Sequence, residues 1–183
     1  MRSKLTFDEA FDLILDTEGS EFVNHRNDPG GKTKFGITER YHPEYWKDGP
    51  PTLEDAERFY RSQWDTMLLG QVNAYCIAHE LFDTATLHGP RRAVLFLQTA
   101  FNYWANIHKK RGKFIPLLKE DGELGPVTLA AINRFCDKDS STIALYTMMN
   151  HLQANRIMSQ ESPDFQLGWF ANRICGLLKT GGV

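Results

Sequence analysis

Glu18 is the first residue of this chain whose position suggests chemistry. It falls three residues after Leu15 and four after Ile14, so it continues the apolar stripe of an amphipathic helix. A carboxylate at the end of such a stripe is partly desolvated, and desolvation raises its pKa. A Glu whose pKa rises from about 4.3 toward ~6 can hold a proton near neutral pH, as a general acid must. The alternative interpretation is that the Glu18 side chain lies in water at the helix end and has no catalytic role. The stripe consists of Phe7, Ala10, Phe11, Ile14 and Leu15.

A second carboxylate and a hydroxyl follow in the next segment. Asp28 lies in a turn-forming cluster of Asn, Pro and Gly, flanked by the short β-like runs 22–23 and 35–37. We predict a small β-hairpin here, packed beside the first helix, that folds Asp28 and Thr33 back toward Glu18. An acid, a second carboxylate and a hydroxyl brought together in this way could perform general acid–base chemistry.

Helix start and stop signals place the elements that hold these residues. Thr6 and Glu9 form a capping-box pattern, so the first helix should begin near Phe7, and Gly19 should end it. Thr52 opens a second pattern of this kind. We therefore predict a mainly α-helical fold with one small β-hairpin near the active site. After the first helix, the expected helical segments are 41–46, 53–67, 72–87, 91–106, 126–135, 142–158 and 163–178.

Trp64 has two interpretations. It falls on the apolar stripe of the helix expected at 53–67, together with Tyr60, and this spacing is typical of core residues. In the functional alternative, one edge of Trp64 lines a ligand-binding groove.

Composition excludes several classes of protein. The net charge of −2 leaves no excess of Lys and Arg to neutralise phosphates, so we expect no nucleic-acid partner. No stretch approaches the ~20 apolar residues of a membrane span, and the first residues show no apolar segment of a secretory signal. Cys76, Cys136 and Cys175 lack metal-site spacing, and no His-x-x-x-His pair occurs, so we expect free thiols and neither metal nor cofactor. Free thiols fit synthesis in a reducing cytosol.

The segment around Glu18 resembles a known family. Its pattern is similar to glycoside hydrolase family 108, N-acetylmuramidases often found as phage endolysins or of the secretion-activator type. The Glu, Asp and Thr set resembles that of phage-type lysozymes and implies a lysozyme-like helical fold. The pattern reads Glu18-Gly19, then Asn27-Asp28-Pro29, then Gly30-Gly31-Lys32-Thr33-Lys34-Phe35-Gly36-Ile37-Thr38.

The resemblance also implies residue roles. Glu18 would protonate the glycosidic oxygen of the β-1,4 bond between N-acetylmuramic acid and N-acetylglucosamine. Asp28 would stabilise the positive charge that develops on the sugar or help to activate water, and Thr33 would position that water. Glu21 is a lesser rival to Asp28. Glycosidases normally use two carboxyl groups, about 5–5.5 Å apart in retaining and roughly 6.5–9.5 Å apart in inverting enzymes. The sequence does not supply that distance, so the stereochemical outcome stays open. Substrate contacts are expected from Asn24, Gly31 and Trp64.

The second half of the chain carries weaker matches. Phe82-Asp83, Gly89, Leu97-Gln98, Gly168-Trp169 and Arg173 fit the family pattern, but Leu87 stands where the family has Asn. Residues 121–128 resemble a motif of peptidoglycan-binding helical modules. We therefore expect a muramidase region at 1–85 and a helical peptidoglycan-binding region at 86–183, packed against the first. The basic connection 109–119 is the expected hinge; its run 108–113 is interpreted as a solvated loop, with contact to an anionic wall polymer as the alternative.

Three functions are compatible with this sequence. The favoured one is a peptidoglycan hydrolase, a monomer made in the bacterial cytoplasm that reaches the wall through a holin or a similar route. A lytic transglycosylase would use one Glu on the same polymer without water and leave an anhydro sugar. A non-catalytic wall-binding or secretion-assisting protein would keep the fold without turnover. The host, the export route and the preferred peptide cross-link stay open.

Overall fold

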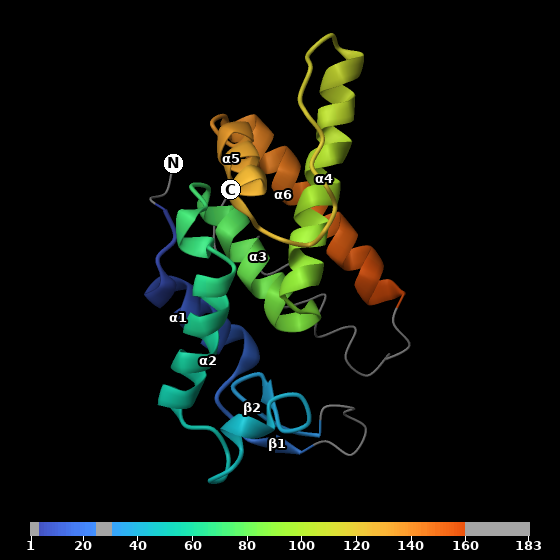
Figure 1. Cartoon of the computed structure of the whole chain (residues 1–183). Helices are drawn as coiled ribbons and strands as arrows, with labels where there is room; N and C mark the ends of the chain where they lie inside the picture. Colours follow the sequence, from blue (N-terminus) through green and yellow to red (C-terminus); the bar gives the residue numbers. More distant parts are fainter. Residues whose placement is uncertain (1–3, 25–30, 160–183) are drawn as a thin grey trace. The chain divides into compact units, whose positions relative to one another are not determined.

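The computed structural model describes residues 4–24 and 31–159 of the chain (Figure 1). These residues are mainly helical, as the sequence predicted, and form six α-helices and one small antiparallel sheet. They belong to two compact units, Thr6–Thr66 and Met67–Val183 with Met1–Leu5. The expected division into a muramidase region at 1–85 and a peptidoglycan-binding region at 86–183 stays a prediction. Within the second unit, α3 (Tyr75–His88) packs on α4 (Pro90–Lys110) and α6 (Asp139–Met158).

In the first unit, α1 (Phe7–Glu18) and α2 (Leu53–Thr66) pack through aromatic side chains. The Phe7 ring meets the edge of Trp64 with centroids 6.0 Å apart, and Phe11 lies 6.0 Å from Tyr60. Burial of aromatic side chains contributes most of the energy of such an interface. The two helices therefore share a small aromatic core. The 3₁₀ turn Pro43–Tyr45 lies between the sheet and α2 in the sequence.

Both predicted capping boxes are present. The Thr6 side chain accepts a hydrogen bond from the Glu9 amide, and the Glu9 carboxylate accepts one from the Thr6 amide. Thr52 and Asp55 make the same pair at the start of α2.

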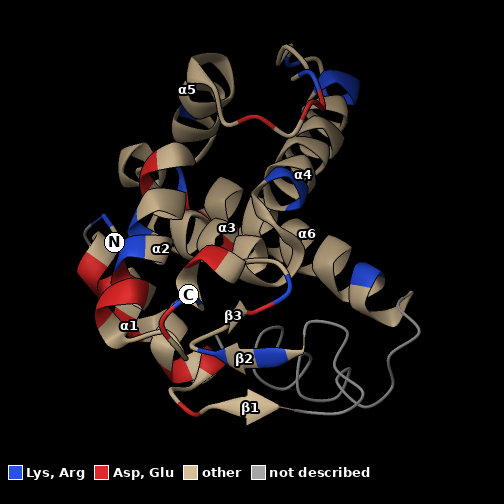
Figure 2. Cartoon of the chain, turned by 60° about the horizontal axis from the view of Figure 1, so that its bottom comes forward, with Lys and Arg blue, Asp and Glu red and all other residues tan. Residues whose placement is uncertain are grey.

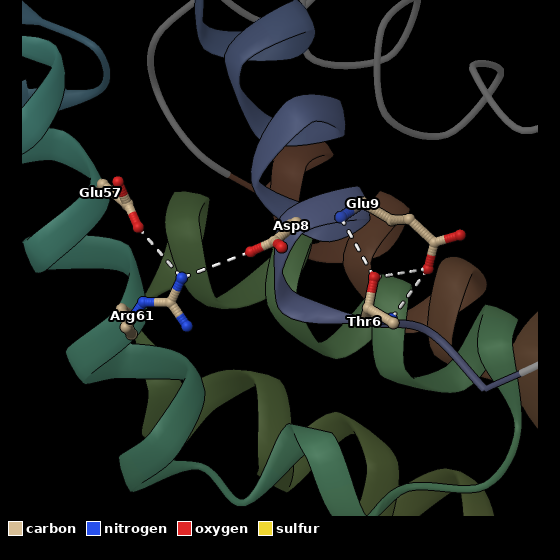
Figure 3. A network of polar contacts seen from close by, with 5 residues as sticks. All are labelled: Thr6, Asp8, Glu9, Glu57 and Arg61. Carbon is tan, nitrogen blue, oxygen red and sulfur yellow. Dashed lines mark hydrogen bonds and ion pairs between the residues drawn. The ribbon is translucent and has the colours of Figure 1, made fainter.

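An ion-pair network links the outer faces of α1 and α2. Arg61 of α2 lies between Asp8 of α1 and Glu57 of its own helix, at 3.3 and 3.0 Å (Figure 3). Its guanidinium also lies 3.8 Å from the centroid of the Phe7 ring. These exposed ion pairs stabilise little by themselves, but the stacked guanidinium covers one edge of the aromatic core.

The sheet has three strands instead of the two of the predicted hairpin. They are β1 (Val23–Asn24), β2 (Lys32–Lys34) and β3 (Ile37–Thr38), in the order β1-β2-β3. The predicted strand at 35–37 includes Phe35 and Gly36. In the structure these two residues form the turn between β2 and β3. Both residues have positive φ, 53° and 73°, as in a type I′ hairpin turn. A strand requires negative φ, so this backbone ends the strand that the β-prone Phe35 suggested.

The second unit continues the helical pattern. α3, α4 and α6 surround a core that includes Leu81, Phe82, Leu97 and Leu145, all at most 1% exposed. The 3₁₀ turn Leu69–Gln71 precedes α3, and α5 (Pro126–Phe135) precedes α6. The helix expected at 163–178 lies outside the described residues, as do Gly168, Trp169, Arg173 and Cys175. Cys136 is a buried free thiol, and burial raises its pKa to about 11.

The segment 121–128 is built around one buried side chain, Gln98 of α4. The Gln98 amide donates to the Asp121 carboxylate at 2.9 Å and to the Glu123 carbonyl at 3.2 Å, while its oxygen accepts from the Gly122 amide at 2.9 Å. Gly122 has φ 76°, and a Cβ there would lie 2.8 Å from the Arg91 carbonyl oxygen. Asp121 and Gly122 of this motif therefore make close contacts inside their own unit.

The prediction of a hinge between the two parts of the chain at 109–119 is wrong. Its first residues belong to α4, and the rest is fastened to that helix: the Asn102 side chain accepts from the Leu118 amide at 2.8 Å and donates to the Leu118 carbonyl at 2.9 Å. Two hydrogen bonds to one backbone unit fix the returning segment against α4, and the whole connection lies within one compact unit.

We predict that Gln98→Leu destabilises the chain by about 1–3 kcal/mol, because it removes the hydrogen bonds that the buried Gln98 amide makes to Asp121, Gly122 and Glu123. The Gln98 amide also holds the pKa of Asp121 below its ordinary value of 3.8. That part of the stabilisation is present above pH 3.8 and is lost as the pH falls through the lowered pKa. Urea unfolding of both proteins at pH 7 and in acid should therefore show a difference that narrows in acid. An equal midpoint at pH 7 would contradict this role of Gln98.

Candidate active site

Glu18 lies at the last position of α1, and its half-buried side chain reaches the turn between β2 and β3. A Cβ on Gly36 would lie 2.9 Å from the Glu18 Oε2 atom and 2.6 Å from the Tyr60 hydroxyl oxygen. The carboxyl group therefore stands directly over the Gly36 backbone, in space that any other residue would fill. The helix end, the turn and α2 meet at this point.

Tyr60 holds the turn in place. It is fully buried, and its hydroxyl donates a hydrogen bond to the Phe35 carbonyl at 2.8 Å. The paired residues on either side of the turn are Lys34 and Ile37, and Ile37 is also fully buried. A carboxyl group carried by a helix end and packed against an anchored turn is positioned by rigid elements, as a catalytic group requires.

Thr33 lies in the middle of the sheet. It is paired with Val23 of β1 and with Thr38 of β3, and paired residues carry their side chains on the same face. The Thr33 hydroxyl is half-buried and donates a long hydrogen bond of 3.4 Å to the Gly31 carbonyl. The Thr38 hydroxyl is buried and has no hydrogen-bond partner among the described residues. The half-buried Thr33 hydroxyl can donate to and accept from a water molecule or a sugar hydroxyl.

The other predicted residues are placed as follows. Asp28 lies outside the described residues, in the connection between the paired residues Asn24 and Lys32. Asn24 and Glu21 are exposed, and Gly31, with φ 76°, directly precedes β2. Trp64 is 5% exposed in the core of α1 and α2, which favours its core interpretation over the sugar-lining one.

Phe22 and Trp46 form an aromatic pair that the sequence did not predict. Their ring centroids lie 6.2 Å apart, Phe22 is 49% exposed, and the indole nitrogen of Trp46 is buried without a hydrogen-bond partner among the described residues. Phe22 precedes β1, so this exposed ring adjoins the strand that bears Asn24. No local signal would have paired these residues, because they are distant in the sequence and neither lies on a helical stripe.

The sequence also did not predict that Gly36 and Tyr60 help to position the Glu18 carboxyl group. Gly36 was visible only as part of the quoted family pattern, and Tyr60 only as a member of an apolar stripe. Within residues 4–24 and 31–159, no three His, Cys, Asp and Glu side chains are grouped so that they could hold a metal ion.

Comparison with known proteins relates the part of the chain that contains this site to a protein family. Residues 11–89 match the family model described as Glycosyl hydrolase 108. The match includes α1 from Phe11, all three strands, α2 and α3. The chain contains a glycosyl hydrolase 108 domain. This domain includes Glu18, Gly36 and Tyr60, so the arrangement described above belongs to the part of the chain that matches a family of glycosidic-bond hydrolases.

The fold extends beyond the glycosyl hydrolase 108 domain. A solved structure of SagA from Brucella abortus matches the chain with a TM-score of 0.71 and 22% sequence identity, covering 96% of this chain and 92% of that one. This likeness shows a shared fold over both units. No curated protein matches the chain.

We predict that Gly36→Ala destabilises the chain more than Gly31→Ala does. Both glycines have φ near 75°, so both substitutions incur the cost of a left-handed backbone. At Gly31 a Cβ meets no described residue within 4 Å, whereas at Gly36 it collides with Glu18 and Tyr60. Thermal melting of both variants should give the lower Tm for Gly36→Ala. Equal melting temperatures would show that the Glu18 side chain can leave the turn at no cost.

Proposed function

We propose that the chain is a peptidoglycan hydrolase, an N-acetylmuramidase that cleaves the β-1,4 bond between N-acetylmuramic acid and N-acetylglucosamine. The observation that supports this most is the Glu18 carboxyl group, which is half-buried and held over the backbone of the Gly36 turn within the glycosyl hydrolase 108 domain. A carboxyl group that is withdrawn from water and fixed in direction can serve as a general acid.

In the proposed reaction, Glu18 gives its proton to the glycosidic oxygen, and the bond between that oxygen and the anomeric carbon breaks. The positive charge that develops on the muramic acid ring is stabilised by Asp28, the second carboxylate that glycosidases normally need. Water then adds to the anomeric carbon and loses a proton to a carboxylate.

Thr33 supplies a hydroxyl that positions this water. Its half-buried side chain lies beside Thr38 on one face of the sheet, and Asp28 belongs to the connection that leads into the same strand. The exposed Phe22 ring, together with Asn24 and Gly31, offers a surface for neighbouring sugars. The protein would be made in the bacterial cytoplasm and act on the wall after release through a holin or a similar route.

Replacing Glu18 tests the acid directly. Glu18→Gln keeps the size and helix propensity of the side chain but has no proton to give, so the rate of peptidoglycan cleavage should fall at least ~10²-fold. Glu54→Gln is the matched control, because it makes the same change at an exposed Glu in the first turn of α2 and should keep near-wild-type activity. The decrease in turbidity of purified peptidoglycan would be measured, with melting temperature as the check of folding.

The outcome distinguishes the candidate functions. A Glu18→Gln protein that clears peptidoglycan as fast as the wild type refutes the acid assignment, and a wild type without turnover refutes the hydrolase. Mass spectrometry of the products separates the remaining pair, because a hydrolase leaves a reducing muramic acid end and a lytic transglycosylase leaves an anhydro sugar.

Two substitutions of Thr33 test the water-positioning role. Thr33→Ser retains the hydroxyl and Thr33→Ala removes it, so the serine variant should keep several-fold more activity than the alanine variant. Both changes remove the same methyl group from the sheet, so the comparison isolates the oxygen. If both variants lose activity to the same extent while remaining folded, Thr33 acts through packing of the sheet and the role is wrong.

A further inference from the structure

The end of α4 and the turn after it carry an unusual combination of exposed side chains. We call residues 109–117 the α4 tip. Four of its residues are exposed cations, namely Lys109, Lys110, Arg111 and Lys113. Two more are large apolar residues that face solvent: Phe114 is 79% exposed and Leu117 is 57% exposed. The tip belongs to the second unit and lies outside the glycosyl hydrolase 108 match.

The charge of the tip is not neutralised within the described chain. None of its four cations makes an ion pair among residues 4–24 and 31–159, and basic residues gather at this end of α4 (Figure 2). Cations near a helix C-terminus interact favourably with the helix dipole, but that effect decays within the last turn. Lys113 lies beyond the helix end, and the chain as a whole has a net charge of −2. The positive field is therefore local to the tip.

The exposed Phe114 is not the result of a frayed end. Gly112 takes a left-handed conformation with φ 76°, and its amide donates to the Lys109 carbonyl at 3.0 Å. The Lys113 amide donates to the His108 carbonyl at 3.0 Å, which closes the helix end. Directly after the tip, the Asn102 side chain is hydrogen-bonded to both the amide and the carbonyl of Leu118. The tip is thus a turn fastened at both ends, with its apolar side chains held outward.

We propose that the α4 tip docks the protein on an anionic lipid surface. The lysines and Arg111 would bind headgroup phosphates, and each cation close to such a surface contributes to binding. Phe114 and Leu117 would enter the boundary between headgroups and acyl chains, where aromatic and apolar side chains are stabilised. An anionic wall polymer would satisfy the cations alone and would leave Phe114 and Leu117 in water. The pairing of charge with outward apolar side chains therefore favours a lipid surface.

Co-sedimentation with vesicles tests this proposal on the full chain. Wild-type protein should bind vesicles of phosphatidylcholine mixed with phosphatidylglycerol and should not bind phosphatidylcholine alone. Lys109→Glu with Lys110→Glu should lower the partition coefficient at least tenfold, since each removed charge near the surface changes it roughly fivefold. Phe114→Ser with Leu117→Ser should also lower it roughly tenfold, and this loss should persist in high salt, where charge contacts are screened.

Matched controls lie elsewhere on the same unit. Arg134→Glu with Lys138→Glu makes the same charge change at exposed positions of α5 and at the start of α6, and Val127→Ser removes an apolar side chain that is 78% exposed. Both controls should bind mixed vesicles like the wild type. Melting temperatures of all variants exclude misfolding as the cause of lost binding.

Three results would overturn the proposal. The first is a wild type that does not bind mixed vesicles, and the second is binding that the controls weaken as much as the tip variants do. The third is a protein that loses binding with the charge reversals but keeps it with Phe114→Ser and Leu117→Ser, because such contact is purely electrostatic and fits an anionic wall polymer. The assay measures no cleavage, so its failure leaves the proposed hydrolase activity separately testable.

Discussion

The arrangement of the candidate active site depends on the absence of a side chain at Gly36. Glu18 Oε2 and the Tyr60 hydroxyl both approach the place where a Cβ would stand, and the turn that contains Gly36 is held by the hydrogen bond from Tyr60 to the Phe35 carbonyl. Gly36 meets two demands at once, a left-handed backbone and a close approach by neighbouring groups. The position of the carboxyl group therefore follows from the backbone of the turn and from the core that carries Tyr60.

The aromatic core between α1 and α2 also positions the proposed catalytic group. The Tyr60 ring lies 6.0 Å from Phe11 of α1, while its hydroxyl contacts the turn, so one buried side chain bridges both helices and the sheet. Any change that shifts α1 relative to α2 would also shift Glu18 relative to the turn. Catalytic groups need positioning within about 0.5 Å, which rigid elements provide better than loops. The aromatic core is thus part of the machinery that fixes the proposed acid.

The second unit shows how a motif can be explained by structure before any binding role is assigned. Residues 121–128 resemble a wall-binding motif, yet Asp121 and Gly122 bond to Gln98, and Gly122 fits tightly against Arg91. These residues are needed to fold the connection onto α4. A contribution of this unit to wall binding stays a prediction. The exposed residues of the α4 tip are not required by the fold in this way.

Sequence alone determined the local features of this protein: both capping boxes, the end of α1 at Gly19 and most helix positions. These follow from residues three or four apart, whose interactions do not depend on the rest of the chain. It also placed Glu18 at the end of an apolar stripe. It could not place Phe35-Gly36 in a turn, because β propensity competed with a backbone that the pairing of Lys34 with Ile37 imposes. It could not choose between core and groove for Trp64, because the same helical stripe serves both. Tertiary structure decided these questions, and it alone brought Glu18, Gly36 and Tyr60 together, since contacts between residues far apart in sequence arise only when helices and sheet pack.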